Sequence, residues 1–270
     1  MRFRLKSGRV IAYHTYGAGD LIVLLHPIGM NAQFWRPVVD HLSRDHRLIS
    51  IDLHGHGESD VSAGPMSLES MADDCIELIE GVGGPCVVGG CSMGSAVAQA
   101  IAARNPAFLK GAIFANGSGP RVPGAGRSDA IEIRAGRAER GMAEIMPENI
   151  DRWFSPEFRE AHPDAVDGVR EILLADDPMV HARCWRALAA RSDQYERIQC
   201  PVLVVGATKD VSATPDGVRA LAAVLADARL AMIEGAGHFA PMERPEEFAN
   251  LIRAFVSERK LFAPLQDQPR

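Results

Sequence analysis

Residues 85–104 of this 270-residue chain read PCVVGGCSMGSAVAQAIAAR and decide how the rest of the sequence is interpreted. The small and apolar run CVVGG predicts a short buried strand, and the residues after the serine predict a helix. Ser92 lies at the turn between them, with Gly90 and Gly94 two positions away on either side. So tight a turn leaves no room for a Cβ at the flanking positions and exposes the serine hydroxyl, as in a nucleophile elbow.

The Gly-x-Ser-x-Gly pattern needs support from the rest of the chain. In a sequence with 25 glycines, a glycine-rich turn at the end of a strand is the ordinary alternative. A serine nucleophile also requires a base, an acid and an oxyanion hole, and in this fold class they follow in a fixed order along the chain.

Composition indicates a globular protein. A hydrophobic content of 47% and a charged content of 24% are typical of such proteins, and 270 residues suit one large domain or a core with an insert. The net charge of −6 and the lack of basic clusters argue against a nucleic-acid partner. The longest aliphatic run, residues 21–25, is too short to span a membrane, and no apolar stretch of a signal peptide follows the basic start.

The cysteines and histidines do not form a metal-binding pattern. Five cysteines, an odd number in a chain without a recognisable signal peptide, predict reduced thiols and a cytoplasmic location. Cys91 adjoins Ser92, but side chains alternate along a strand, so Cys91 should point away and be structural. The pair His54 and His56 lacks further spaced ligands. We therefore expect no metal and no cofactor.

Predicted strands alternate with predicted helices along most of the chain. Strands are predicted at residues 10–16, 21–25, 47–51, 86–90, 109–115, 201–206 and 229–233, and helices near Asn31, after Ser67, after Ser92, at Thr214 and at Pro245. Residues 10–16 alternate apolar and polar side chains and predict an antiparallel hairpin strand closed by Gly17 and Gly19. The alternation predicts an α/β protein with a mostly parallel sheet, helices on both faces, and ligands bound at the carboxyl ends of the strands.

The pattern changes after residue 120. Residues 121–126 indicate a linker, and up to residue 197 the pattern is helical without an aliphatic strand. Candidate helices cover residues 130–140, 143–154, 163–175 and 179–190, with Pro147, Pro156, Pro163 and Pro178 expected at or near their ends. We therefore predict a helical cap at 121–197, inserted between core segments 1–120 and 198–260 and followed by a loose tail at 261–270.

Two further residues follow predicted strands, as Ser92 does. Asp210 comes after the strand at 201–206 and His238 after the strand at 229–233. The order Ser92, Asp210, His238 is the order that α/β-hydrolase topology requires. In such a triad His238 accepts the serine proton, and Asp210 orients the imidazole and stabilises its charged form. Separately, Asp210 could be a turn residue and His238 a loop histidine; their joint placement favours the triad.

An oxyanion hole requires two backbone N–H groups directed at the developing charge. One is expected from Met93, the residue after the nucleophile. The other is expected from Ile28, in the loop after the strand at 21–25.

Together these motifs resemble the full motif set of the α/β-hydrolase superfamily. They are His26-x-x-Gly29 with Trp35, Asp52-x-x-Gly55-x-Gly57-x-Ser59, Gly90-x-Ser92-x-Gly94, Gly206-x-x-x-Asp210 and Gly235-x-Gly237-His238. The resemblance covers about residues 8–120 and 198–256, and within the superfamily the chain is similar to the 3-oxoadipate enol-lactone hydrolases, also in the cap at 152–159 and 172–178. Two positions depart from the pattern: Pro27 and Ser95 stand where glycines are usual.

The resemblance implies a cofactor-free serine hydrolase that opens 3-oxoadipate enol-lactone through an acyl-enzyme. The carboxylate of that substrate requires a cation, for which the cap offers Arg134, Arg137, Arg140 and Arg152 without singling one out. Trp153 is a candidate for the pocket wall, whereas Trp35 is expected in the core. The alternatives are a carboxylesterase, another lactonase, a C–C bond hydrolase of aromatic ring-fission products, or a small-molecule receptor on the same fold. The sequence leaves the oligomeric state open.

Overall fold

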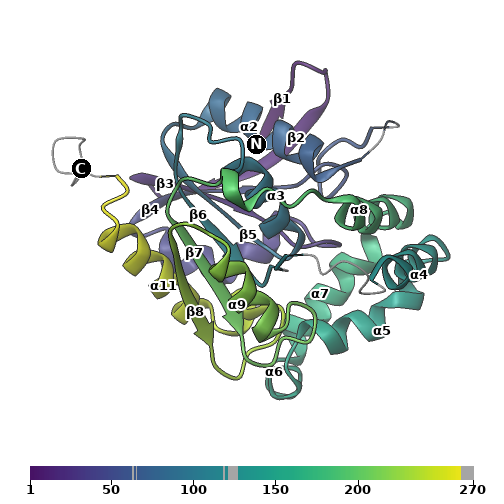
Figure 1. Ribbon diagram of the computed structural model, residues 1–270. Helices are drawn as coiled ribbons and strands as arrows, with labels where there is room; N and C mark the ends of the chain where they lie inside the picture. Colours follow the sequence, from purple (N-terminus) through teal and green to yellow (C-terminus); the bar gives the residue numbers. More distant parts are fainter. Residues whose placement is uncertain (63, 65, 118, 121–126, 263–270) are drawn as a thin grey trace.

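The computed structural model describes residues 1–62, 64, 66–117, 119–120 and 127–262, and its centre is a single sheet (Figure 1). The strands are β1 (Arg2–Arg4), β2 (Val10–Tyr16), β3 (Asp20–Leu25), β4 (His46–Ile51), β5 (Cys86–Cys91), β6 (Leu109–Ala115), β7 (Val202–Ala207) and β8 (Ala228–Ile233). Their order in the sheet is β1-β2-β4-β3-β5-β6-β7-β8. The pairs β1–β2 and β2–β4 are antiparallel and the others parallel, which confirms the mostly parallel sheet.

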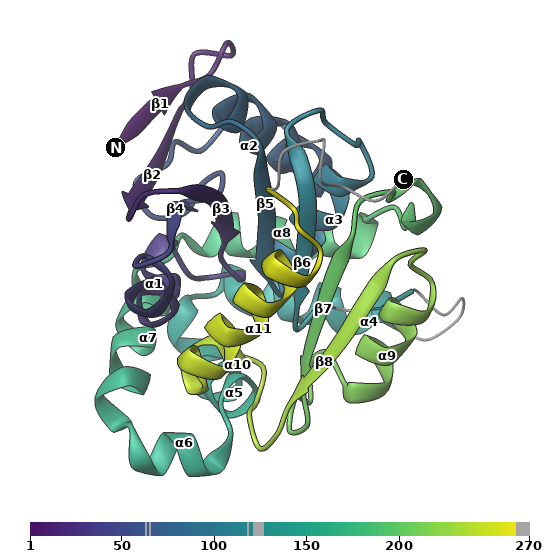
Figure 2. The ribbon, with the colours of Figure 1, turned by 90° about the vertical axis from the view of Figure 1, so that its left-hand side faces the viewer.

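Helices cover both faces of the sheet. They are α1 (Arg36–Leu42), preceded by the 3₁₀ helix η1 (Ala32–Trp35), α2 (Leu68–Val82), α3 (Met93–Ala102), α9 (Pro215–Ala223), α10 (Ala240–Glu243) and α11 (Pro245–Glu258), with η2 (Tyr195–Arg197) before β7. Side chains alternate along β3, so Ile22 joins the apolar layer that also contains the buried side chains of α1 and α11, and Val23 joins the layer of α2, α3 and α9. In Figure 2, α1 and α11 lie on the near side of the sheet. Trp35 is fully buried in the first layer, as predicted.

A group of helices follows β6 and precedes β7 in the sequence, and it packs beside the sheet (Figure 1). We call them the cap helices: α4 (Arg127–Glu139), α5 (Met142–Trp153), α6 (Pro156–Ala161), α7 (Pro163–Ala175) and α8 (Pro178–Ala190). The short α6 was not predicted. Pro147 was expected near a helix end but lies inside α5, whose buried Ile145, Ile150 and Trp153 hold the helix together across it. Packing of the apolar side therefore outweighs the one backbone hydrogen bond that proline removes.

The predicted hairpin partner of β2 is wrong. After Gly17 and Gly19 the chain enters β3, but β3 does not pair with β2, because β4 lies between them. The hairpin partner is instead β1, a three-residue strand that the sequence did not reveal. Alternation of side chains indicates that a segment is a strand but carries no information about its neighbour.

The chain beyond α11 also differs from the prediction at its start. Leu261, expected in a loose tail, is buried against the core, where its side chain fills the space left by the missing side chain of Gly111. The predicted linker at 121–126 and the rest of the tail, residues 263–270, lie outside the described residues. None of the described helices has the length and apolar character needed to cross a bilayer.

Candidate active site

Ser92 lies at a strained turn between β5 and α3. Its φ of 55° and ψ of −113° place a non-glycine residue in a rarely occupied backbone region. A Cβ on Gly90 would lie 2.1 Å from the carbonyl oxygen of Gly94, and a Cβ on Gly94 would lie 2.1 Å from the carbonyl oxygen of Leu25. Both glycines are therefore required sterically, and the turn leaves Ser92 partly exposed.

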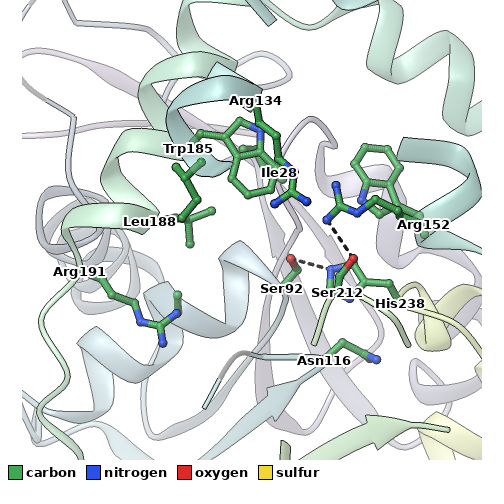
Figure 3. A pocket seen from close by; sticks show the side chains of 13 residues that line it. Ile28, Ser92, Asn116, Arg134, Arg152, Trp185, Leu188, Arg191, Ser212 and His238 are labelled. Atoms are coloured by element: carbon green, nitrogen blue, oxygen red, sulfur yellow. Dashed lines mark hydrogen bonds between the residues drawn. The ribbon is translucent and has the colours of Figure 1, made fainter. Parts of the chain in front are cut away.

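The ends of β5, β7 and β8 bring Ser92, Asp210 and His238 into one hydrogen-bonded line. The hydroxyl oxygen of Ser92 lies 2.9 Å from Nε2 of His238, and Nδ1 of His238 lies 2.8 Å from Oδ2 of Asp210 (Figure 3). Because a carboxylate can only accept, Nδ1 carries the proton and Nε2 is left to accept from the Ser92 hydroxyl. This is the arrangement in which an imidazole can act as a base toward a serine.

Asp210 is a buried carboxylate with donors on both oxygens. The N–H groups of Ser212 and Ala213 donate to Oδ1 at 2.7 and 2.9 Å, and the side-chain amide of Asn116 donates to Oδ2 at 3.0 Å. Burial acts to raise the pKa of Asp210, but its electrostatic interaction and hydrogen bond with His238, together with the hydrogen bonds donated by Asn116 and Ala213, outweigh burial and lower it. Asp210 is therefore an ionised acceptor. Asn116 directly follows β6, and the sequence analysis did not identify it as a partner of Asp210.

The two residues predicted to form the oxyanion hole, Met93 and Ile28, both lie close to Ser92. Met93 is the first residue of α3, so its N–H has no acceptor within the helix, and Ile28 lines the cavity above Ser92. The loop before Ile28 is held by His26, whose Nε2 accepts from the N–H of Leu53 at 2.9 Å while its Nδ1 donates to the carbonyl of Pro27 at 2.8 Å. Pro27 therefore takes part in this turn through its carbonyl oxygen, which requires no N–H.

The neighbours of Ser92 in sequence are structural. Cys91 is fully buried, as predicted, and its thiol lies 3.8 Å from the carbonyl oxygen of His238. Burial raises the pKa of Cys91 well above its usual value, so the thiol stays protonated. Ser95, the second departure from the family pattern, is also fully buried, and its hydroxyl accepts from the side chain of Gln99.

A cavity of about 110 Å³ separates Ser92 and His238 from the cap helices. It is lined by Ile28, Ser92, Ala96, Asn116, Ile131, Arg134, Arg152, Trp153, Trp185, Leu188, Arg191, Ser212 and His238. Trp153 contributes to the wall at the end of α5, where its ring stacks on Phe239 at 4.7 Å between centroids. No acidic side chain belongs to this lining, as far as the chain is described.

Two arginines of the cap helices direct their guanidinium groups into this cavity (Figure 3). Arg152 donates to the hydroxyl of Ser212 at 3.0 Å, and the guanidinium of Arg134 lies 5.4 Å from the centre of the Trp185 ring. Among the described residues, neither arginine has a carboxylate within ion-pairing distance. Burial lowers the pKa of Arg152, and the nearby charge of Arg134 lowers it further.

The other two arginines that the sequence offered as candidates have protein partners. Arg137 pairs with Glu148 and Glu144, and the exposed Arg140 pairs with Glu144. Arg191, which follows α8 and was not considered from the sequence, lines the cavity and pairs with Asp193 at 3.0 Å.

The pair His54 and His56, considered above as possible metal ligands, lies away from the cavity lining. His54 lies beside Arg9, which is paired with Asp74 at 2.6 Å, and burial together with the charge of Arg9 lowers the pKa of His54 to about 4. No group of three or more histidine, cysteine or acidic side chains suited to a metal ion is found in the described part of the chain.

Comparison with known proteins shows the family. A family model described as "Alpha/beta hydrolase family" matches residues 22–251. The chain belongs to the alpha/beta hydrolase family.

Similar alpha/beta hydrolases carry several substrate names. The chain is 28% identical to (E)-2-((N-methylformamido)methylene)succinate hydrolase of Acinetobacter baylyi, over 94% of this chain and 96% of that protein. It is 27% identical to 3-oxoadipate enol-lactonase 2 of the same organism, over 90% and 92%. Among solved structures, a thermophilic esterase from Thermogutta terrifontis with malate bound superposes with a TM-score of 0.85 at 30% identity, covering 96% of this chain and 98% of that one. Family membership thus gives a hydrolase with esterase- and lactonase-like neighbours, and the substrate must be argued from the cavity.

Proposed function

We propose that this alpha/beta hydrolase opens a small, anionic, activated lactone or ester through an acyl-enzyme, with 3-oxoadipate enol-lactone as its substrate. The observation that carries the proposal is the line Ser92–His238–Asp210 at the floor of a cavity into which two arginines point. It requires no cofactor, since each step below uses side-chain and backbone groups of the chain.

The chemistry follows from the hydrogen bonds. His238 takes the proton of Ser92 as its oxygen attacks the lactone carbonyl, and the N–H groups of Met93 and Ile28 stabilise the resulting oxyanion. The intermediate collapses with cleavage of the ring C–O bond, the electron pair goes to the enolate oxygen, and His238 returns the proton to it. His238 then takes a proton from water, whose oxygen attacks the acyl carbon. The bond between that carbon and the Ser92 oxygen breaks, His238 returns the proton to the Ser92 oxygen, and the enol of the released product becomes the ketone.

The cavity supports an anionic substrate. Arg134 and Arg152 repel one another across it, and a carboxylate between them would relieve that repulsion and form charge-assisted hydrogen bonds. The small volume, about 110 Å³, disfavours long acyl chains. Two of the relatives are named for carboxylate-bearing substrates, a methylenesuccinate and the enol-lactone of 3-oxoadipate.

A carboxylesterase acting on simple esters is the second candidate, which the esterase neighbour at 30% identity supports. A receptor that binds but does not turn over its ligand would need no ordered base. The hydrogen bond between His238 and Ser92 therefore favours an enzyme.

The test is a side-by-side comparison of three substrates. Freshly prepared 3-oxoadipate enol-lactone is followed by its loss of ultraviolet absorbance, next to its carboxylate methyl ester and to phenyl acetate, with Ser92→Ala as the control for serine dependence. We expect serine-dependent turnover of the lactone, with kcat/KM about 10–100-fold higher than for the neutral methyl ester, the range that corresponds to the loss of about one charge-assisted hydrogen bond. Faster turnover of phenyl acetate would favour the carboxylesterase, and a single product per protein molecule would favour the receptor.

A further inference from the structure

A second buried carboxylate lies next to the proposed active site and plays no part in the chemistry above. Glu243, at the end of α10, is 5% exposed. Its Oε1 accepts from the N–H groups of Gly237 and Ser155 at 3.0 and 2.9 Å, and its Oε2 accepts from the hydroxyl of Ser155 at 2.6 Å. No basic side chain of the described residues forms an ion pair with it. A carboxylate buried without a cation is costly unless donors satisfy it, so these three donors hold Glu243 in place.

The donors belong to two segments that meet at His238. Gly237 directly precedes His238, and Ser155 follows α5 in the cap helices. A Cβ on Gly237 would lie 2.8 Å from the backbone nitrogen of Ser155, so the two segments touch backbone to backbone. On the other side of His238, the N–H of Phe239 donates to the carbonyl of Trp153 at 2.8 Å. Both neighbours of His238 are therefore tied, one through Glu243 and one directly, to the segment 153–155.

We propose that Glu243 is a positioning residue, which fixes the imidazole of His238 relative to Ser92 and couples it to the cavity wall. The inference rests on the proposed function, in which His238 is the base. Trp153 forms part of that wall and stacks on Phe239, so a ligand that presses on Trp153 acts on the same segment that Glu243 holds. Displacement of a reacting group by about 1 Å can reduce a rate about 10²-fold, so a modest shift of this loop is sufficient to impair the base.

Three variants and a control separate positioning from general stability. Glu243→Ala removes all three hydrogen bonds. Glu243→Gln keeps the shape: its carbonyl oxygen can accept from both backbone N–H groups, and its amide can donate to the oxygen of Ser155 after the hydroxyl rotates. Ser155→Ala removes the hydroxyl that donates to Glu243 and, with it, the oxygen that caps α6 by accepting from the N–H of Phe158 at 3.2 Å. Glu246→Ala, an exposed glutamate at the start of α11, is the matched control.

The primary readout is the rate at which diethyl 4-nitrophenyl phosphate modifies Ser92, measured by release of 4-nitrophenol. This reaction requires the base but not the arginines. For each variant, kcat and KM for the lactone and the melting temperature are measured as well. We expect Glu243→Ala to lower the modification rate and kcat together by about 10²-fold, with KM changed less than about 3-fold. Glu243→Gln should recover to within about 5-fold of the wild type, Ser155→Ala should fall between them, and Glu246→Ala should match the wild type.

The outcomes are distinguishable. If the wild type neither reacts at Ser92 nor turns over the lactone, the proposed function fails and the inference falls with it. If the wild type reacts and folded Glu243→Ala reacts equally fast, the inference alone is overturned. If Glu243→Ala does not fold, the other two variants decide. Wild-type modification rates in both Glu243→Gln and Ser155→Ala, together with lowered melting temperatures, would overturn the positioning role. Slower modification by folded Ser155→Ala at an unchanged melting temperature would support it.

Discussion

The floor and the roof of the cavity are built on different principles. At the floor, formed by Ser92, Asp210 and His238 at strand ends, every side-chain oxygen and nitrogen of these three residues has a hydrogen-bond partner within the chain. At the roof, formed by Arg134 and Arg152 of the cap helices, two positive charges face the cavity without a carboxylate partner among the described residues. The side chains of the floor are therefore ordered by one another, whereas under the proposed function the charges of the roof are matched by an anionic substrate.

This difference separates two tasks. A preorganised floor lowers the barrier for any ester carbonyl placed on it, because its dipoles need not reorganise during the reaction. An arginine charge without a carboxylate partner at the roof discriminates between ligands, because it stabilises a bound anion much more than a bound neutral ester. Changes at the floor should therefore affect kcat for all substrates, and changes at the roof should affect kcat/KM for anionic ones.

The largest effect is expected for Ser92→Ala, which removes the nucleophile from the floor. By analogy with other triads, kcat should fall on the order of 10⁶-fold for the lactone and for phenyl acetate alike. Steady-state kinetics on both substrates measure this, and an unchanged melting temperature shows that the elbow still folds. A variant that retains a tenth of the wild-type turnover would mean that another group attacks the carbonyl.

Asp210→Asn should be the next most severe change, with kcat lowered about 10⁴-fold for both substrates. The asparagine amide presents either a donor or a weaker acceptor to Nδ1 of His238, so the imidazole is no longer held in the tautomer that accepts from Ser92. The exposed Asp216→Asn in α9 is the matched control and should keep the wild-type rate. Near-normal activity of Asp210→Asn would mean that a different carboxylate orients His238.

The floor could be predicted from the sequence because its signals are local. Gly90 and Gly94 are required by the tight turn at Ser92, since in the structure a Cβ added at either position would lie 2.1 Å from a backbone carbonyl oxygen. Asp210 and His238 could be placed because parallel strands end at one edge of the sheet. The partner of β2 could not, because which strand lies next to another depends on the path of the whole chain.

The roof could not be predicted, because its properties depend on contacts between helices. Arg134 and Arg137 are three residues apart on α4, so helical spacing places both on a similar side. The position of α5 decides which of them has a partner: Glu148 of α5 forms an ion pair with Arg137, whereas Arg134 lines the cavity. Glu243 is a similar case: in sequence it is one of several glutamates near α11, and its burial is decided by Ser155, which lies 88 positions away along the chain.

The roof is tested by removing its charges one at a time. Arg134→Gln and Arg152→Gln should each lower kcat/KM for the lactone about 10–100-fold, mainly through KM, since a hydrogen bond to a charged group contributes about 1.5–3 kcal/mol. Turnover of phenyl acetate should change less than about 3-fold. Arg140→Gln, which removes an exposed cap arginine paired with Glu144, is the matched control. Equal losses on both substrates would show that the arginines shape the floor rather than select the ligand.

The smallest effect is expected from cysteine modification, which asks whether the floor contains a second nucleophile. Cys91 precedes Ser92, but burial raises its pKa well above the usual value, so at pH 8 almost no thiolate exists to react. Cys200, the least buried cysteine, has a pKa raised to about 11 by burial and should be the first to react. Native protein treated with iodoacetamide at pH 8 should therefore keep its activity while Cys200 is slowly alkylated, as followed by mass spectrometry of peptides, whereas urea-unfolded chain should react at every cysteine. Loss of activity in proportion to alkylation of Cys91 would contradict the structure, because a thiol on the buried side of β5 reaches reagent only if the strand beneath Ser92 opens.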